Sequence, residues 1–499
     1  MKNNINKQKG QSLLWVLGFL ATMAVTFAGV YSVGQATSEK QKIVNAADAA
    51  AYTGGMVEAR ALNLTAYANR AEIANEVFVA QMVSMESWVA YIKETIDSYK
   101  TIANWLSATV VLAPVAQAVA RVLTVIENAI GAAQGPLGLA VDASIYAVDK
   151  VYYSLAYKAA TLAIFTPPSM AYAAQSAAES VLAANVANQG GKIDAAPIAF
   201  KTAELGLVNA ARWNNAFKQY TKSSIGSASD GRRNAAEILQ ASRDGFSTDR
   251  KGTALPFLNV LWGNGHIGKC VRYVGGLELG ASKDGKTILK DYERWEAQDT
   301  SEYYVASGWR CRKNGIAYGW GRSTADSNGS NGDEKYDPHS NAGPKAYDAN
   351  KSHSGWSGVK ELWDIARKND DTPIDAFKPG EETLTFTVAA KKANTEIKNN
   401  ENLNFMNRSS TSKLGSADLK ADLMDGQVSA KAEARVFFSR PVKSNEDITG
   451  TSLFRADNHK EVSNLYNPYW QVRLKSMNWM SPETLAIYGS KSALAAFAQ

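Results

Sequence analysis

The pattern of hydrophobic and polar positions differs between successive stretches of the chain, and the first stretch has the most distinctive pattern. Residues 10–38 contain no charged side chain, and residues 13–31 are almost entirely apolar. An apolar run of about 20 residues is long enough to cross a bilayer as a helix, which satisfies its own backbone hydrogen bonds in lipid. The pattern predicts a transmembrane helix at residues 13–34, preceded by a short tail at residues 1–12.

The charges before this segment predict its orientation. Lys2, Lys7 and Lys9 precede it. Because positive charge resists translocation, we expect a cytoplasmic tail and export of the rest of the chain. A cleaved signal peptide is the alternative, since residues 34–36 (Gly-Gln-Ala) have the small side chains that signal peptidase requires. The apolar stretch exceeds the usual signal-peptide core of about 7–15 residues, which favours a retained anchor.

Small residues spaced four apart follow the apolar stretch. They stack on one face of a helix and allow another helix to approach closely, either within this chain or by self-association or contact with a partner. The alternative is an alanine-rich helix with good propensity and no partner. Since nothing breaks a helix before the glycine pair at 54–55, we expect the transmembrane helix to continue outward as far as this pair. The face consists of Ala46, Ala47, Ala50, Ala51, Gly54 and Gly55.

Helical periodicity continues over much of the first half of the chain. Residues 74–92 carry an apolar stripe at spacings of three and four. Residues 35–245 are therefore expected to form a helical stalk and bundle standing on the anchor. Residues 101–120 are uncharged but weakly apolar, which favours a buried bundle helix over a second transmembrane span. Further helices are expected at 115–130, 140–163, 171–188 and 197–222, with breaks at Pro114, Gly135-Pro136, Pro167-Pro168 and Gly190-Gly191.

The texture changes near residue 250, where short alternating runs and tryptophans become frequent. These runs predict an antiparallel sheet and an α+β domain over residues 246–499, so the chain as a whole is expected to be α+β. Residues 323–351 are polar and rich in Gly, Asn and Asp, which predicts a loop insertion. Strands are expected at 269–274, 301–306, 316–320, 383–388 and 432–438.

The two cysteines, Cys270 and Cys311, both lie in the part expected outside the cytoplasm. An oxidising compartment permits a disulfide, and closing a loop of about 40 residues stabilises a fold by roughly 4 kcal/mol in the chain-entropy model. Two separate buried thiols are the alternative. The spacing and the expected compartment favour the disulfide.

Other candidate chemistry is weak, and we predict neither catalysis nor a metal or cofactor site. The acidic run at 326–334 departs from an EF-hand loop, which needs Gly at its sixth position and Glu at its twelfth. His339 and His353 lie near Asp337 and Asp348, but no second ligand cluster supports zinc. The chain has 54 Lys and Arg against 48 Asp and Glu, spread evenly, so nucleic acid is not an expected partner.

Several motifs resemble a known family. Residues 9–12 (Lys-Gly-Gln-Ser), the apolar helix, and residues 45–51 (Asn-Ala-Ala-Asp-Ala-Ala-Ala) resemble the Tad domain, the TadE/TadG-like module of Flp-pilus assembly proteins. Three further segments resemble a TadG-related subgroup. They are residues 58–63 (Glu-Ala-Arg-Ala-Leu-Asn), residues 66–71 (Ala-Tyr-Ala-Asn-Arg-Ala), and, near the C-terminus, Arg440-Pro441 with residues 465–470 (Leu-Tyr-Asn-Pro-Tyr-Trp).

The resemblance implies a protein anchored in the bacterial inner membrane, with its bulk in the periplasm and a structural part in pilus assembly. Its implied partners are the bilayer and other pilus or secretion-channel subunits. A minor pseudopilin or surface adhesin is one alternative. Prepilins are cut after a glycine with Glu five residues beyond, whereas Trp15 takes that place after Gly10. A tethered hydrolase or binding protein is the other alternative.

Overall fold

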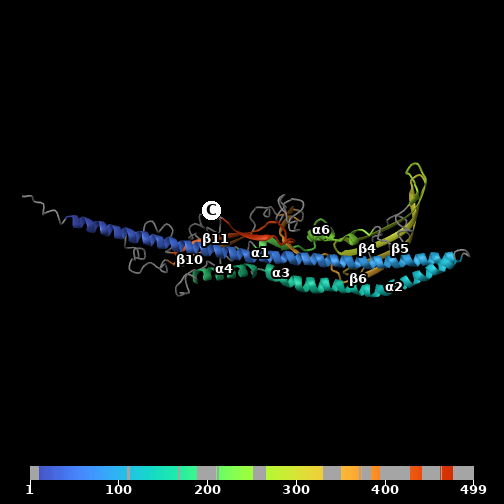
Figure 1. Cartoon of the computed structure of the whole chain (residues 1–499), viewed down its shortest axis with the longest axis horizontal. Helices are drawn as coiled ribbons and strands as arrows, with labels where there is room; N and C mark the ends of the chain where they lie inside the picture. The colour runs from blue at the N-terminus through green and yellow to red at the C-terminus, as the bar shows by residue number, and fades with distance from the viewer. Residues whose placement is uncertain are drawn as a thin grey trace, which may run out of the picture.

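One helix of 97 residues, α1 (Gln11–Ser107), forms the axis of the computed structural model (Figure 1). At about 1.5 Å per residue, its length is on the order of 145 Å. It continues outward beyond the apolar stretch, as predicted, but it also runs on through the glycine pair at 54–55, where the sequence suggested the first break. The structure describes residues 11–108, 113–166, 169–187, 209–210, 213–250, 266–329, 350–369, 372–373, 384–393, 427–440, 461 and 463–475.

A second layer of helices runs back along one side of α1. Its first three helices follow one another without a gap and pack on α1. The expected break at Gly135-Pro136 is wrong, because Pro136 lies within α2 on its exposed side, where water can satisfy the carbonyl that proline leaves free. The helices after α1 are α2 (Ala113–Tyr146), the π-helix η2 (Ala147–Tyr157), α3 (Lys158–Phe165), α4 (Ser169–Ala187), α6 (Arg233–Ala241) and α7 (Gly245–Thr248).

Among the described residues, the strands form two larger sheets and two strand pairs. The five-stranded sheet has the order β2-β3-β4-β5-β6, and the three-stranded sheet has the order β10-β11-β12. All pairings are antiparallel except that of β5 with β6. The strands are β1 (Phe217–Gln219), β2 (His266–Gly268), β3 (Leu277–Lys290), β4 (Arg294–Ser307), β5 (Arg312–Asp326), β6 (Asn350–Ser354), β7 (Trp363–Ile365), β8 (Arg367–Asn369), β9 (Thr372–Pro373), β10 (Leu384–Ala393), β11 (Gln427–Phe438) and β12 (Trp470–Lys475).

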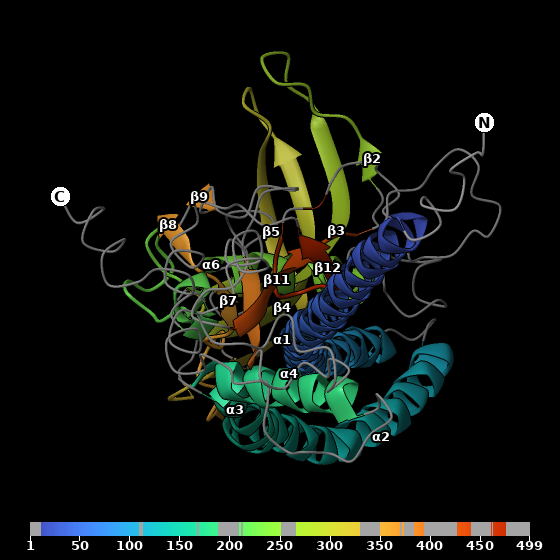
Figure 2. The ribbon, with the colours of Figure 1, turned by 90° about the vertical axis from the view of Figure 1, so that its left-hand side faces the viewer.

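The helix α1 lies between the helical layer and the sheets. Viewed along the long axis, α2, α3 and α4 cover one side of α1 and the larger sheets stand on the other (Figure 2). The three-stranded sheet packs on the earlier part of α1, and the five-stranded sheet packs nearer its C-terminal end. The architecture is therefore α+β, as expected, but the sheets flank α1 instead of following a separate bundle.

The predicted division at residues 245/246 does not separate two cores. Strand β1 pairs with β7 across this position, and one hydrophobic cluster combines residues of α1, η2, α6 and β4. Whether the two parts fold independently stays a prediction.

Three local predictions are wrong. The helix expected at 197–222 is confirmed only at the described residues 209–210 and 213–216, because strand β1 begins at Phe217 and pairs with a distant strand. The strand expected at 269–274 is a turn, because Tyr273 has φ of 70° and the chain reverses there. The loop expected at 323–351 begins later, since residues 323–326 form the end of β5 and residues 350–351 belong to β6. Three of the other expected strands lie within β4, β5 and β11, and residues 384–388 of the fourth lie within β10, while residue 383 lies outside the described residues.

Candidate functional site: the anchor helix and its packing face

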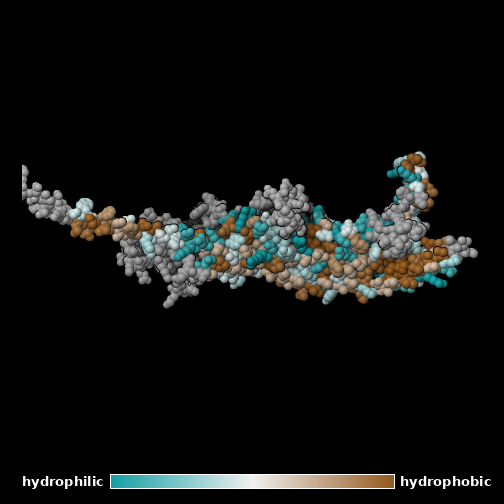
Figure 3. Space-filling view, viewed as in Figure 1, coloured by the Kyte–Doolittle hydropathy of each residue, from teal (hydrophilic) through white to brown (hydrophobic). Residues whose placement is uncertain are grey.

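The N-terminal part of α1 extends beyond the folded body (Figure 1). The segment Ser12–Tyr31 is long and apolar enough to cross a membrane, with mean hydropathy 2.1 and no part buried against the rest of the protein. Figure 3 shows it as a hydrophobic projection. The hydroxyls of Thr22 and Thr26 donate to the carbonyls of Phe19 and Thr22, at 2.9 and 2.8 Å. These two threonine hydroxyls are thus satisfied within the helix, as lipid requires.

The helical run Ala113–Phe165 meets the same length and composition criteria, with mean hydropathy 1.2 and 11% of its most apolar window buried. The buried bundle helix expected at 101–120 is wrong, because this range contains the end of α1 and the start of α2, and most of its described side chains are exposed. Helix α2 packs one face on α1 and leaves residues such as Val115, Val125 and Leu139 exposed. The run lies alongside α1, antiparallel to it, on the body of the protein (Figure 1).

The predicted small-residue face is completely covered within the chain. Ala47, Ala50 and Ala51 are fully buried, and Ala46 is 4% exposed. Their cluster includes Ala174 and other residues of α4 on one side and residues of β10 and β11 on the other. The close helix contact that the spacing predicted is thus supplied by α4, while the sheet contact is one that the sequence did not reveal.

The glycine pair makes the contact with the sheet. A Cβ atom on Gly54 would lie 2.1 Å from Cε1 of Phe386, and one on Gly55 would lie 3.1 Å from Cγ1 of Val472. These residues come from β10 and β12. Since real Cβ atoms do not approach so closely, Gly54 provides the space into which the Phe386 ring packs.

Two asparagines further along α1 bind the segment that precedes and begins β12. The Asn63 side chain donates to the Trp470 carbonyl and accepts from the Trp470 N–H, both at 3.0 Å. The fully buried Asn69 donates to the Leu465 carbonyl at 2.7 Å and accepts from the Tyr157 hydroxyl at 2.8 Å. Residues 58–63 and 66–71, which resemble the TadG-related subgroup, therefore contact residues 465–470, which resemble it too. In each contact an asparagine side-chain amide forms the hydrogen bonds that the backbone of residues 465–470 would otherwise lack.

A cluster of buried charges lies where α1, η2 and the chain before β7 meet. Trp356 Nε1 donates to Glu76 at 2.6 Å, and Lys360 Nζ lies 3.4 Å from Glu76 and pairs with Asp149. Burial and the neighbouring Glu76 raise the pKa of Glu72 to about 9, so this acid is neutral at pH 7. Burial also raises the pKa of Glu76 despite the opposing Lys360. The cluster holds one neutral acid beside a paired lysine.

His353 connects α1 to α2 further along. Its Nε2 lies 2.6 Å from Glu86, its Nδ1 lies 2.7 Å from Asp142, and Ser323 donates to Glu86 at 2.6 Å. Burial lowers the pKa of His353, but the two carboxylates raise it by more, so its pKa is above the usual value. The serine hydroxyl bonds to the acid and not to the imidazole, so the arrangement is not that of an activated nucleophile.

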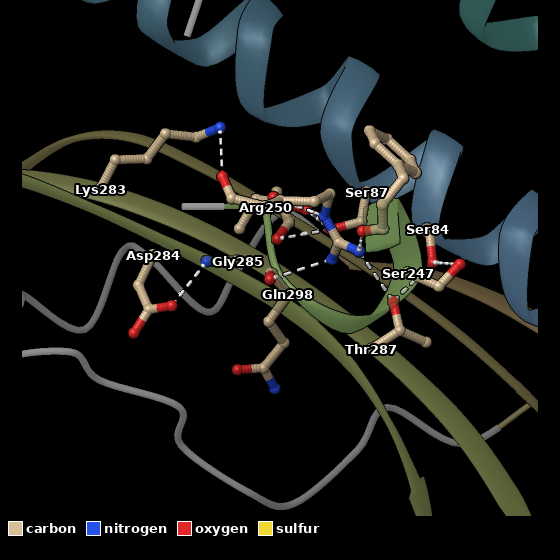
Figure 4. Close-up of polar contacts among 12 residues, drawn as sticks. Ser84, Ser87, Ser247, Arg250, Lys283, Asp284, Gly285, Thr287 and Gln298 are labelled. Atoms are coloured by element: carbon tan, nitrogen blue, oxygen red, sulfur yellow. Dashed lines mark hydrogen bonds and ion pairs between the residues drawn. The ribbon is translucent and has the colours of Figure 1, made fainter. Parts of the chain in front are cut away.

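A second polar network joins α1 to the five-stranded sheet (Figure 4). Arg250 and Asp299 are fully buried and form an ion pair at 2.8 Å. Ser87 of α1 donates to Asp299 at 2.7 Å, and Ser84 lies 2.6 Å from the Thr287 hydroxyl. Each charge in the network thus has hydrogen-bonding partners, which buried ions require.

The same interface is closely packed. A Cβ atom on Gly321 would lie 2.0 Å from the Ser87 carbonyl oxygen, so β5 approaches the backbone of α1. Lys283 donates to the Arg250 carbonyl at 3.0 Å, and burial lowers its pKa to about 8 although Asp299 opposes the shift. These buried polar groups have structural partners throughout, and sequence reasoning missed them because the partners lie far apart along the chain.

The structure joins Cys270 to Cys311 in a disulfide. Each cysteine lies in or beside a turn, and not in the strand-like context that the sequence suggested. Among the described residues, no three His, Cys, Asp or Glu side chains are grouped to hold a metal ion. Of the residues considered for zinc, His339, Asp337 and Asp348 lie outside the described part, and His353 binds the carboxylates above.

Comparison with known families identifies the segment that carries the exposed apolar stretch and the small-residue face. Residues 10–60 match the family described as putative Flp pilus-assembly TadE/G-like. This segment is a Tad domain. The Tad domain implies involvement in Flp pilus assembly and covers the first half of α1. Neither the curated proteins nor the solved structures contain a match to the chain.

Proposed function

We propose that this chain is a structural component of Flp pilus assembly, anchored in the inner membrane and facing the periplasm. One observation carries the proposal: within the Tad domain, the apolar half of the helix is exposed, whereas the small-residue half is buried by the chain itself. The exposed half is therefore available to lipid, and the buried half fixes the folded body to the anchor. The proposal assigns the chain no catalytic role and no cofactor.

The exposed half has the character of a lipid-facing helix. Its large apolar side chains point in all directions around the axis, with Trp15 at 82% and Leu17 at 58% exposed. A helix that is apolar all round is stable when lipid or protein covers every face. The lysines that precede it favour retention of the N-terminus in the cytoplasm, which places the body in the periplasm.

The buried half favours a rigid scaffold. Because α4 and the three-stranded sheet occupy the small-residue face, contacts with other pilus or secretion-channel subunits use the outer surface of the body. The helix α1 continues roughly 110 Å beyond Tyr31, at about 1.5 Å per residue. We propose that it holds this surface at a fixed height above the membrane.

We further propose that the chain belongs to the TadG-related subgroup. The segments that carry this resemblance are joined in the structure through Asn63 and Asn69, which bind Trp470 and Leu465. Their pairing gives a physical reason for the motifs to occur together. This pairing supports a common architecture for the subgroup in which the segment near the C-terminus packs against the first helix.

The test of the anchor is a topology measurement on the full chain. A reporter enzyme that is active only in the periplasm is fused after Gln499, and a cytoplasmic reporter is fused there in a second strain. We expect activity from the periplasmic reporter alone, with the protein in the membrane fraction. Activity from the cytoplasmic reporter alone would contradict the proposed orientation.

A minor pseudopilin is the second candidate, because Gly10 precedes the apolar stretch and prepilins are cut after a glycine. The mature N-terminus distinguishes the two: a scaffold keeps Met1, whereas a processed pseudopilin begins at Gln11. We expect the unprocessed terminus, since Trp15 stands where prepilins have Glu. Trp15→Glu restores that glutamate and is the matched variant. Release of the wild-type chain at Gln11 by prepilin peptidase would favour the filament subunit.

A further inference from the structure

The outer end of the five-stranded sheet carries a feature that the anchor and scaffold do not use. Two loops meet there, residues 269–277 and 307–313, and we call them together the disulfide tip. Cys270 is bonded to Cys311, and the Tyr273 N–H donates to the Trp309 carbonyl at 2.8 Å. The tip projects sideways from α1 near the end farthest from the N-terminus (Figure 1).

The tip combines exposed apolar side chains with positive charge. Val274 is 77% exposed, Trp309 is 65% exposed and Tyr273 is 58% exposed. The two loops contain no acidic residue. Exposed apolar side chains that are gathered in one place mark interaction surfaces, whereas single exposed apolar side chains are ordinary. The loops also contain five basic residues: Lys269, Arg272, Arg310, Arg312 and Lys313.

The tip is held in one shape. Tyr273 has φ of 70° and Cys311 has φ of 46°, in the left-handed region that side chains other than glycine rarely adopt. The Cys311 N–H donates to the Gly308 carbonyl at 3.0 Å, and Val271 bridges to Gly275. Backbone strain of this kind persists where surrounding contacts enforce it and is concentrated at functional sites.

The chemistry of the tip fits an anionic lipid surface. Trp and Tyr rings settle at the level of the headgroups, and Arg and Lys are attracted to lipid phosphates at about 1 kcal/mol each. Exposed aliphatic residues, Val274 and Leu277, enter the acyl boundary. Nucleic acid fits less well, because aliphatic side chains offer no stacking surface for bases.

The position of the tip determines which surface it meets. Strand β5 packs on α1 at Ser87, where Gly321 makes its close approach. Ser87 lies roughly 80 Å beyond Tyr31 along the helix, at about 1.5 Å per residue. The bilayer that holds the anchor is therefore out of reach of the tip on an upright helix. We propose that the disulfide tip docks on an anionic lipid surface other than the bilayer that holds the anchor.

This inference rests on the proposed function in one respect: the anchor determines which bilayer holds the chain, and the tip docks on a different lipid surface. The full chain is inserted through its anchor into nanodiscs of phosphatidylcholine and mixed with free vesicles. One set of vesicles is phosphatidylcholine alone, and the other contains phosphatidylglycerol. Co-flotation should capture nanodiscs on the phosphatidylglycerol vesicles alone, with capture falling as salt rises. Failure of the chain to enter nanodiscs would count against the anchor and is scored separately.

Two tip variants carry the decisive comparison. Trp309→Ser and the double variant Arg272→Ser/Arg310→Ser should each weaken vesicle capture about tenfold or more. Trp105→Ser and Arg121→Ser are the matched controls, since both side chains are exposed near the same end of α1 but outside the tip. They should bind like the wild type.

Three results would overturn the proposal. The first is no capture of phosphatidylglycerol vesicles by the wild-type chain, and the second is capture by the tip variants at wild-type affinity. The third is an equal loss in Trp105→Ser. Binding of a single-stranded oligonucleotide without binding of vesicles would assign the tip to nucleic acid instead. Circular dichroism of each variant verifies that the fold is retained.

Discussion

The two parts of α1 share one helical backbone but have opposite surroundings. In residues 12–31, large side chains such as Phe19 (68% exposed) contact nothing in the folded body. In residues 43–107, small and polar side chains such as Ala50 and Glu72 are almost completely buried. The more hydrophobic part of the helix is thus the less buried one.

This inversion shows that burial within the body depends on shape and hydrogen bonding more than on hydrophobicity. Small residues at 46–55 allow α4 and the sheet to approach, and asparagines further on pair with distant backbone groups. The apolar part lacks such features and is suited to a solvent that contacts every face, which is lipid. Paired variants along the helix test this difference.

The largest effect is expected from shortening a leucine in each part. Leu62→Ala should lower the free energy of unfolding by about 2–5 kcal/mol, because Leu62 is fully buried in a core with residues of α3 and β10. Leu17→Ala should change it by less than about 0.5 kcal/mol, since Leu17 is 58% exposed. The measurement is thermal or denaturant unfolding of the detergent-solubilised chain. Equal effects of both variants would show that residues 12–31 pack on the body.

A smaller effect is expected from adding one methyl group. Alanine is a better helix former than glycine by about 1 kcal/mol, so Gly131→Ala should stabilise α2, where a Cβ atom meets nothing within 4 Å. Gly54→Ala should instead destabilise by about 1–3 kcal/mol, because its Cβ meets the buried Phe386 ring. Stabilisation by both substitutions would mean that β10 does not pack against Gly54.

The features that could be predicted from the sequence are those that depend on the composition or spacing of residues within one short segment. The anchor follows from uninterrupted apolar composition, and the close packing at 46–55 follows from the spacing of small residues. The sheet that covers this face was missed, because Phe386 and Ala434 lie more than 300 residues away. The roles of Asn63 and Asn69 were hidden for the same reason, since an asparagine in a helix gives no sign of a distant partner.

Local sequence patterns gave wrong secondary-structure predictions at two places, where the surroundings of the segment in the folded protein determine its conformation. Residues 269–274 alternate like a strand, yet the disulfide and the positive φ of Tyr273 make them a turn. Pro136 predicts a break, yet its exposed position allows α2 to continue. The pairing of Cys270 with Cys311 was predictable because a chain with two cysteines allows one internal bridge.

The last comparison concerns pH, which should affect the packed part of α1 and not the uncharged anchor. The pKa of Glu72 is raised to about 9 from 4.5, so the folded protein holds a proton that the unfolded chain loses. The stability that Glu72 contributes is therefore complete below about pH 4.5 and is lost as the pH rises towards 9. Over that range a single group changes stability by up to about 1.4 kcal/mol per pH unit.

Glu72→Gln keeps a neutral side chain of similar shape and removes the titration. Its unfolding free energy should fall less steeply between pH 5 and 9 than that of the wild type, by up to about 1.4 kcal/mol per unit. Glu76, whose pKa burial also raises, remains in the variant and leaves part of the slope. Glu72→Asp retains a carboxyl group and should keep the wild-type slope even if its packing is poorer. Identical slopes for the wild type and Glu72→Gln would show that Glu72 ionises in the folded protein, and the buried cluster around Lys360 would then be more open to water than its contacts indicate.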